Sequence, residues 1–520
     1  MNKNKLIKEI EKLLIYGRKR DLIDNWDEIP VRNALLALFE LSRPYNGSIK
    51  KAELETNFRS PQQILDNMID YALDKGLIKN DSITARDLFD TKIMGCLMPR
   101  QSELIDKFWR IAGEKDIEQA TNYFYELAQY SNYIRTERLN ANKKWTVDTE
   151  YGTLQITINL AKPEKDPGQI EKSLTEEKDQ YPLCQLCLEN VGYKGRPDYP
   201  ARQNLRIIPV ILQNEQWFFQ YSPYVYFNEH CIVINREHRK MEINKNTFYK
   251  LFDFIDEFPH YFIGSNADLP LVGGSILEHE HFQGGNYTFP MEKAEIESEL
   301  YYPDFPDLNL YILKWPLSVI RLKGKNKDKI VEAAQHIFST WKNYDDHKRL
   351  IKSHSKSGGE FIQHNTVTPI ARKKDKYYEL DLVLRNNRKT EEYPNGIFHP
   401  HQELHHIKKE NIGLIEVMGL AILPGRLKEE MDYIKDILIG DIAFKEIKNN
   451  NSLLKHKRWI EDLLSSYGRN NTSEEINKIL KKEVGIKFKK VLEDAGVFRQ
   501  SQEGRKGFYK FLNSTGIEVG

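Results

Sequence analysis

The sequence predicts an α+β protein, in which a body of antiparallel strands lies between a helical N-terminal region and a helical C-terminal region. Up to about residue 129, apolar residues recur at the spacing of helices. From Leu154 they alternate instead, at Leu154, Ile156, Ile158 and Leu160, as on a half-buried strand. Charged sequence with helical spacing returns after about Arg426. These two changes of period place the strands in the middle of the chain.

Size, charge and cysteine content limit the class of protein. A chain of 520 residues with 40% hydrophobic residues can bury large cores in two to four structural units. Lys+Arg (77) and Asp+Glu (76) nearly cancel, which argues against a nucleic-acid partner and leaves small molecules. No apolar run reaches membrane-spanning length, and Met1–Arg20 predicts an amphipathic helix, so no membrane partner is expected. Four cysteines without an export signal favour the reducing cytoplasm.

Individual elements follow from local signals. In the N-terminal region, Ser60 is expected to cap a helix that has Pro61 at its first position and Gln63 returning a hydrogen bond, and that ends at Gly76. Asn214 is expected to turn a hairpin. The predicted strands are 154–160, 207–212, 217–221, 231–234, 310–313, 318–322 and 380–384, and the predicted later helices are 245–258, 327–344, 453–466 and 474–492.

Two His-x-His triplets suggest that the body consists of two related halves. His279-Glu280-His281 ends one strand-helix block, and His399-Pro400-His401 occupies a similar place in the next. With 14 histidines in the chain, chance is the alternative. The expected domains are a helical region 1–129, a catalytic half 130–350, a second half 351–430 and a helical region 431–520.

His279, His281 and Gln283 form a row, because residues two apart in a strand point to the same face. A neutral imidazole can attack phosphorus near pH 7 and split one displacement into two. A glutamine carboxamide can donate to a phosphoryl oxygen without repelling an anion. Gly273-Gly274 and Gly284-Gly285 flank the row and would let main-chain amides approach phosphates. Structural histidines near a turn are the alternative, which the complete pattern makes less attractive.

The segment Gly273–Gly285 resembles the active-site segment of the class II galactose-1-phosphate uridylyltransferases, also called UDP-glucose–hexose-1-phosphate uridylyltransferases. The resemblance extends over nearly the whole chain, through Ser131–Thr136, Ile158–Pro167, Tyr221–Tyr224, His364–Arg372 and Phe398–His401. It implies a fold of the histidine-triad superfamily. It also implies that UDP-glucose transfers UMP to His281, that Gln283 holds the phosphoryl group, and that galactose 1-phosphate then accepts the UMP.

The same resemblance suggests where the phosphates bind. The candidates are the basic residues in or near the matching segments and the small residues just before the row: Arg135, Arg138, Lys162, Lys165, Arg202, Arg206, Gly273, Gly274 and Ser275. Any one of these cations alone could be a solvated surface charge. The chain contains no Gly-x-x-x-x-Gly-Lys-Ser/Thr loop for a metal-bound triphosphate, and no organic cofactor is implied.

Cys184 and Cys187 have the spacing of a metal knuckle. A redox pair and two unligated thiols remain open alternatives. Similarity to the class I uridylyltransferases implies a structural zinc. Its ligands in this chain would be Cys184, Cys187, His238 and His279. The same similarity also implies a second metal, for which His364, His399 and His401 with Glu295 or Glu297 are candidates. The chain departs from class I at Glu280, where class I has proline, and in the position of Ser275.

Two further expectations concern partners and competing functions. Lys408–Glu416 resembles a segment that contacts the nucleotide from a neighbouring subunit in class I, which implies a homodimer; a buried core strand with a solvated lysine pair is the alternative. A hydrolase with water as acceptor and a zinc-containing nucleotide-binding scaffold are the competing functions. Gln283 argues against hydrolysis, because the related hydrolases usually have a histidine there that can act as an acid.

Overall fold

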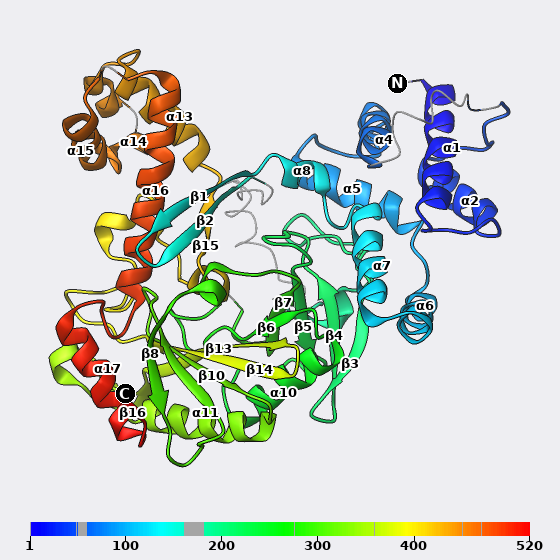
Figure 1. Ribbon diagram of the computed structural model, residues 1–520. Helices are drawn as coiled ribbons and strands as arrows, with labels where there is room; N and C mark the ends of the chain where they lie inside the picture. The colour runs from blue at the N-terminus through cyan, green and yellow to red at the C-terminus, as the bar shows by residue number, and fades with distance from the viewer. Residues whose placement is uncertain are drawn as a thin grey trace. The chain divides into compact units, whose positions relative to one another are not determined.

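The computed structural model describes residues 2–47, 49, 60–160, 181–274, 276–357, 359–449, 451–469 and 471–519 (Figure 1). The chain forms two compact units. The first contains residues 1–141 and 161–238, and the second contains residues 142–160 and 239–520. Among the described residues, no helix is both long enough and apolar enough to cross a membrane.

Helices dominate the first unit, as predicted for the start of the chain. Helix α1 buries Leu6, Ile10 and Leu13 on one face, which confirms the amphipathic pattern. The helices are α1 (Lys3–Lys19), α2 (Glu28–Leu38), α4 (Gln62–Asp74), α5 (Ile83–Gly95), α6 (Gln101–Glu114), α7 (Ile117–Tyr130), α8 (Thr136–Asn140) and the short η1 (Leu188–Asn190).

The predicted start of helix α4 is wrong by one residue. Pro61 is the N-cap, so the expected capping box of Ser60 and Gln63 does not form. The Ser60 hydroxyl instead accepts a hydrogen bond from the amide of Gln62, at 3.2 Å. The predicted end is confirmed, because Gly76 follows the C-cap with a φ of 73°, a conformation that glycine adopts without strain.

The first unit also contains an antiparallel meander of β3 (Ile208–Leu212), β4 (Glu215–Tyr221) and β5 (Cys231–Asn235). Gln213 and Asn214 connect β3 to β4 with φ values of 49° and 61°, the left-handed conformations of a tight hairpin turn. The hairpin predicted around Asn214 is therefore confirmed.

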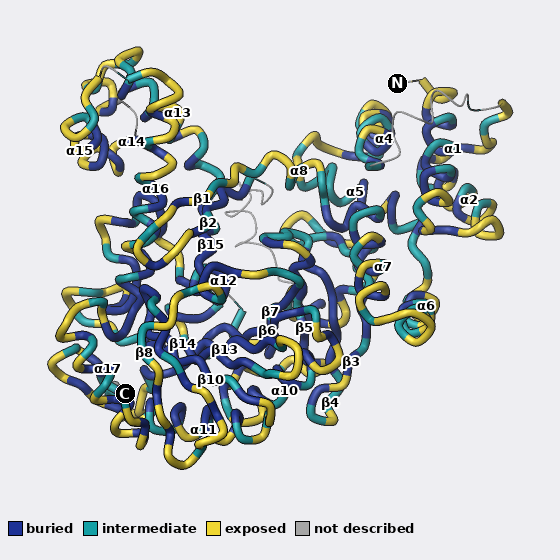
Figure 2. Tube along the Cα trace, in the orientation of Figure 1, coloured by how far each residue is buried: buried dark blue, intermediate teal, exposed yellow. Residues whose placement is uncertain are grey.

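The second unit is built around an antiparallel sheet, which confirms the predicted α+β class. The strands lie in the order β16 (Glu518–Val519), β8 (Ile296–Tyr301), β9 (Asn309–Leu313), β10 (Val319–Gly324), β14 (Tyr377–Asn386), β13 (Asn365–Lys374), β6 (Phe262–Gly264) and β7 (His281–Gly285). Every neighbouring pair in this order is antiparallel. Figure 2 shows the central strands as mostly buried.

The two faces of this sheet differ in chemistry. One face carries Leu380, Leu382 and Leu384 of β14 and packs against α10 (Lys245–Glu257), whose Phe252 ring lies 5.4 Å from the ring of Tyr378. Helix α11 (Lys327–Lys342) also packs against β10, β13 and β14 (Figure 1). We call the opposite face the polar face; its members on β13, β14 and β10 are Thr366, Thr368, Arg372, Glu379, Asp381, Arg385 and Arg321.

Ion pairs stabilise the polar face. Asp381 is fully buried and accepts from Arg321 Nε and from Arg372 Nη2, each at 2.6 Å. Arg372 also contacts Glu379, at 2.9 Å. Burial acts to raise the pKa of Asp381, but the two guanidinium groups hold that pKa below its ordinary value. A face tied together in this way keeps its other side chains in defined positions.

The remaining elements of the second unit include a smaller sheet of β1 (Lys143–Thr149), β2 (Gly152–Asn159) and β15 (Leu420–Pro424), in which β15 runs parallel to β2. Helix α16 (Ser473–Ala495) packs against β1 and β2. The others are η2 (Pro290–Lys293), η3 (His347–Arg349), β11 (His354–Ser357), β12 (Glu360–Gln363), η4 (Gln402–Leu404), α12 (Leu414–Val417), α13 (Leu427–Ile439), η5 (Phe444–Asn449), α14 (Asn451–Leu454), α15 (Lys457–Tyr467) and α17 (Gln502–Ser514).

The predicted helix 453–466 is divided into α14 and α15 at a buried charged cluster. His456, the N-cap of α15, lies 2.9 Å from Glu430 through Nε2 and 2.8 Å from His406 through Nδ1. Arg426 and Lys455 also bind the Glu430 carboxylate. Burial lowers the pKa of His406 to about 3, so this ring is neutral in the folded protein.

This cluster predicts a loss of stability on acidification. The unfolded chain binds a proton at His406 below pH ~6.5 whereas the folded chain does not, so stability falls as pH drops from about 6.5 toward the folded pKa. The free energy of unfolding is measured in urea at pH 7.5 and at pH 5.5. Its decrease between these pH values should be about 1 kcal/mol smaller in His406→Gln than in the unmodified chain. The exposed His347 provides a control, since His347→Gln should keep the original dependence. Equal dependence in all three proteins would refute the prediction.

Candidate active site

His281 and Gln283 lie on the polar face of the second unit. Gln283 pairs with Gly264, Gly264 with Ile370, and Ile370 with Asp381, and directly opposed residues in a sheet point to the same side. His281 is two residues before Gln283 on β7 and therefore shares its face. The structure thus places two members of the predicted row, His281 and Gln283, on a face whose other residues are largely polar, whereas His279 lies at a bend before β7.

The environment of His281 selects one tautomer of its ring. Nδ1 lies 2.8 Å from the main-chain oxygen of His279, and a carbonyl oxygen can only accept, so Nδ1 carries the hydrogen. Nε2 is then left with its lone pair. Burial lowers the pKa of His281 to about 4, which keeps the ring neutral near pH 7. A buried, neutral imidazole with a defined Nε2 lone pair is suited to nucleophilic attack.

The glycines before the row are required by close packing. A Cβ atom on Gly273 would lie 2.2 Å from the carbonyl oxygen of Ala267, and one on Gly274 would lie 2.7 Å from Nδ2 of Asn266. Neither position accepts a side chain without rearrangement. Ser275, the third predicted residue of this loop, lies outside the described residues.

Asn266 is a site residue that the sequence analysis missed. Its Oδ1 accepts from the amide of Leu414 at 2.9 Å, while its Nδ2 faces Gly274. The side chain thereby connects the glycine loop to a segment 148 residues away. The only local signal was a Ser-Asn pair directly after the short apolar strand β6, which matches no motif by itself.

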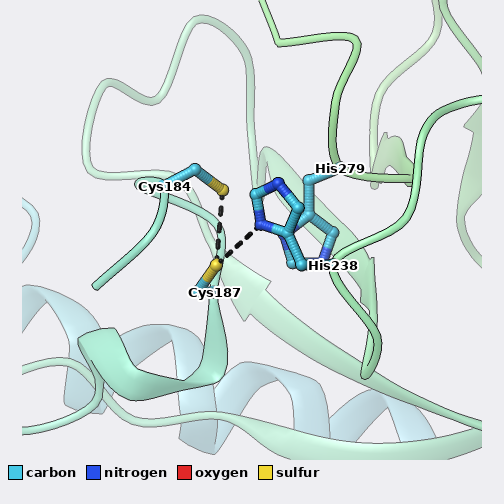
Figure 3. A group of neighbouring side chains, drawn as sticks. All are labelled: Cys184, Cys187, His238 and His279. Atoms are coloured by element: carbon cyan, nitrogen blue, oxygen red, sulfur yellow. Dashed lines mark hydrogen bonds between the residues drawn. The ribbon is translucent and has the colours of Figure 1, made fainter. Parts of the chain in front are cut away.

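Cys184, Cys187, His238 and His279 form a group of potential metal ligands (Figure 3). The two sulfur atoms are 3.5 Å apart, and Cys187 Sγ lies 3.1 Å from Nδ1 of His238. One ligand atom from each of the four residues lies within 4.8 Å of the others. The four residues expected from the resemblance are therefore close together in the structure.

The Cys184–Cys187 turn is organised to present its sulfur atoms. The amide of Leu186 donates to Cys184 Sγ at 3.4 Å, and Asn190 Nδ2 donates to the carbonyl oxygens of both cysteines at 2.8 Å. A hydrogen bond from Cys187 lowers the pKa of the Cys184 thiol to about 7, with burial opposing and main-chain amides assisting. Neither cysteine forms a disulfide.

The donor set fits zinc. Tetrahedral zinc, with bonds of about 2.3 Å to sulfur and about 2.0 Å to nitrogen, separates its ligand atoms by roughly 3.3 to 3.8 Å. The measured separations of 3.5 and 3.1 Å are close to this range. Two soft sulfur donors and two imidazoles are a common combination in structural zinc sites.

The candidates for a second metal do not come together. His364 bonds to Asn387 and Ser355, Glu295 pairs with Lys314, and Glu297 pairs with Arg505. That expectation is wrong, because Glu295, just before β8, and Glu297, on β8, pair with the cations Lys314 and Arg505. Across the described residues, the second group of three close donors is instead His401, Glu403 and Asp494.

Arg135 and Arg138 are engaged within the helical part of the first unit. Arg135 is bound to Asp90, with Nη2 2.7 Å from Oδ1, and Arg138 is bound to Asp87, with Nη1 2.8 Å from Oδ2. A phosphate contact by either residue would have to compete with these carboxylates, so their phosphate-binding role stays a prediction.

Arg202 and Arg206 have different surroundings. Within the described residues, Arg206 donates to the main-chain carbonyl oxygens of Pro99, Gln203 and Leu205. Arg202 lies 5.7 Å from the centre of the Tyr133 ring. Lys162 and Lys165, the other two predicted cations, lie outside the described residues.

The segment Lys408–Glu416 is not a core strand with a solvated lysine pair. Lys408 is buried and its Nζ lies 3.0 Å from Glu416, whereas Lys409 is exposed. The segment leads into helix α12, and the Leu414 side chain covers Gly264 on the polar face, where a Cβ would lie 2.8 Å from it.

Family models and a solved structure align with this chain. The family models described as galactose-1-phosphate uridyl transferase N-terminal domain and C-terminal domain match residues 23–240 and 253–450. A solved structure of yeast Ap4A phosphorylase Apa2 aligns with 65% of this chain and 89% of its own, at 10% identity and a TM-score of 0.31.

Curated proteins named galactose-1-phosphate uridylyltransferase match almost end to end. The protein from Caldanaerobacter subterraneus subsp. tengcongensis is 54% identical over 98% of both chains. That from Clostridium acetobutylicum is 52% identical over 97% of this chain and 99% of its own. That from Bacillus subtilis is 48% identical over 99% and 98%. This chain belongs to the galactose-1-phosphate uridylyltransferase family.

Proposed function

We propose that this protein is a UDP-glucose–hexose-1-phosphate uridylyltransferase of galactose metabolism, in which His281 carries the uridylyl group. The observation that supports this most is the hydrogen bond from His281 Nδ1 to the His279 carbonyl, because it leaves Nε2 as the nucleophilic atom. The names of near full-length relatives specify galactose 1-phosphate and uridylyl transfer. UDP-glucose as the donor is implied by the resemblance described above.

In the first half-reaction, Nε2 of His281 attacks the α-phosphorus of UDP-glucose. A P–N bond forms, the bond to the bridging oxygen breaks, and glucose 1-phosphate leaves with the bonding electron pair. The ring becomes positively charged as the bond forms, and the His279 carbonyl that accepts from Nδ1 stabilises this charge.

In the second half-reaction, a phosphate oxygen of galactose 1-phosphate attacks the same phosphorus. The P–N bond breaks, UDP-galactose leaves, and His281 recovers its lone pair. Gln283 would donate its amide N–H to a nonbridging oxygen in both steps. A carboxamide can donate a hydrogen bond, but it can neither transfer a proton to a leaving group nor remove one from water. This property favours transfer between phosphates over hydrolysis.

Structural zinc completes the proposed site, with Cys184, Cys187, His238 and His279 as ligands. Its contribution would be to cross-link these segments and hold His279 in place. The carbonyl that orients His281 belongs to His279, so a fixed His279 also supports the nucleophile.

Phosphate contacts and assembly form the finer part of the proposal. Arg206 is supported by its bonds to neutral carbonyls, which leave its charge available to an anion. A homodimer through residues 408–416 is supported by the resemblance of that segment, and Lys409 rather than the buried Lys408 offers an exposed charge.

Uridylylation of His281 is testable with UDP-glucose labelled in the uridine. The intact protein should retain about one acid-labile label per chain and release glucose 1-phosphate, as expected for a covalent intermediate. His281→Ala should retain none. His347→Ala, which changes an exposed histidine, should label normally. Full labelling of His281→Ala would refute the proposed nucleophile.

Gln283 is expected to stabilise the transition state. Gln283→Ala should slow single-turnover uridylylation about 10²-fold, the usual effect of losing one donor to a developing oxyanion. The test is the rate of glucose 1-phosphate release with enzyme in excess. A rate within twofold of the unmodified enzyme would show that Gln283 does not hold the phosphoryl group.

Metal content tests the zinc site directly. Cys187→Ser should lose most of its zinc and melt at a lower temperature, because a structural zinc contributes to folding free energy. Cys231→Ser, a buried cysteine on β5, is the matched control and should keep its zinc. Elemental analysis gives the zinc per chain. Unchanged zinc in Cys187→Ser would exclude this ligand set.

A further inference from the structure

Glu280 stands between the two histidines of the row and has no role in the proposed chemistry. It directly precedes β7, which begins at His281. Only 5% of the residue is exposed. A buried carboxylate requires partners, and Glu280 has two cations: Arg239 Nε at 2.7 Å and Lys250 Nζ at 3.2 Å.

Glu280 and Arg239 are also joined through the main chain. The Glu280 amide donates to the Arg239 carbonyl oxygen at 2.7 Å, and two residues further on the Met241 amide donates to the Leu277 carbonyl oxygen at 2.8 Å. Arg239 therefore holds Glu280 at two points, one on the backbone and one on the carboxylate. Lys250, on helix α10, attaches the same carboxylate to the helix layer of the second unit.

The amide of Glu280 belongs to the same peptide group as the carbonyl of His279. A peptide group is planar, so a partner that fixes the direction of its N–H also fixes the direction of its C=O. That C=O accepts the hydrogen bond from Nδ1 of His281. The attachment to Arg239 on one side of the peptide plane thus determines where the acceptor for His281 lies on the other.

We propose that Glu280 is a positioning residue for the nucleophile. Its ion pair with Arg239 keeps the peptide group between His279 and Glu280 in one orientation, and this orientation maintains the Nδ1–H tautomer and the direction of His281. The inference rests on the proposed role of His281. It assigns a function to the position where the class I uridylyltransferases have proline, which could make neither the amide hydrogen bond nor the ion pair.

The side-chain attachment is tested by Glu280→Gln, which keeps the shape and removes the charge. Single-turnover release of glucose 1-phosphate should slow about 10- to 100-fold, as when the partner that orients a reacting group is lost. The concentration of UDP-glucose at half-maximal rate should change less than about threefold, because Glu280 does not contact substrate in this proposal.

Glu430→Gln is the matched control. Glu430 is equally buried, at 5% exposed, and is bound to Arg426, Lys455 and His456 away from the row. This variant should lose thermal stability and keep a uridylylation rate within about twofold. If Glu430→Gln slows the reaction as much as Glu280→Gln does, general destabilisation explains both and the proposal fails.

Two double variants separate positioning from packing. Arg239→Met should slow the reaction to the same degree as Glu280→Gln, and the combination should be no slower than either alone, because both break one attachment. Glu280→Gln/Lys250→Met removes the buried ammonium group and should recover stability without recovering rate. Additive losses in the first pair, or recovery of rate in the second, would overturn the proposal.

Zinc content and His281 labelling complete the test. Zinc per chain is measured for every variant, and a rate that returns when zinc is restored to Glu280→Gln would assign the defect to the metal group and overturn the proposal. Unmodified enzyme that never labels at His281 would instead refute the proposed function. Failure of the two ideas is therefore distinguishable.

Discussion

The peptide group between His279 and Glu280 is the interaction on which the site depends. Its carbonyl accepts from Nδ1 of His281, and its amide donates to Arg239. A planar group with a partner on each side cannot rotate to satisfy one without disturbing the other. The nucleophile thereby takes its tautomer from the backbone.

The sheet of the second unit provides the platform for this peptide group. Its apolar face packs against α10 and α11, and its polar face carries His281 and Gln283. The ion pairs of Asp381 with Arg321 and Arg372 hold the polar face together from within. Because those charges neutralise one another, the face remains polar without leaving a buried carboxylate unpaired.

Covering segments then complete the neighbourhood of His281 within the second unit. Asn266 joins the glycine loop to Leu414, and Leu414 covers Gly264. Glycine at positions 264, 273 and 274 is what allows such close approach. These contacts are neutral hydrogen bonds and van der Waals contacts, whereas the ion pairs join side chains of β10, β13 and β14.

Local patterns predicted much of the secondary structure. Alternating apolar residues predicted β2, strand-like segments further along the chain predicted β9 and β14, and the turn residues before β4 predicted its hairpin. The sequence pattern does not predict β6, because its three residues form a strand only through pairing with β13 and β7. The pattern also does not predict the break at His456, because helical periodicity continues through it. The boundary between α14 and α15 depends on the buried partner of His456, Glu430. The predicted domain boundaries stay predictions.

The sequence by itself determined the row His279, His281 and Gln283, the cysteine spacing and the family, because these depend on residue types at short, fixed intervals. Only the tertiary structure decided that Nδ1 of His281 carries the hydrogen. It also decided that Glu280 forms ion pairs with Arg239 and Lys250, and that Arg135 is paired with Asp90. The reason is physical: a tautomer or an ion pair is set by whichever partner folding brings within about 3 Å, and no local pattern encodes that partner.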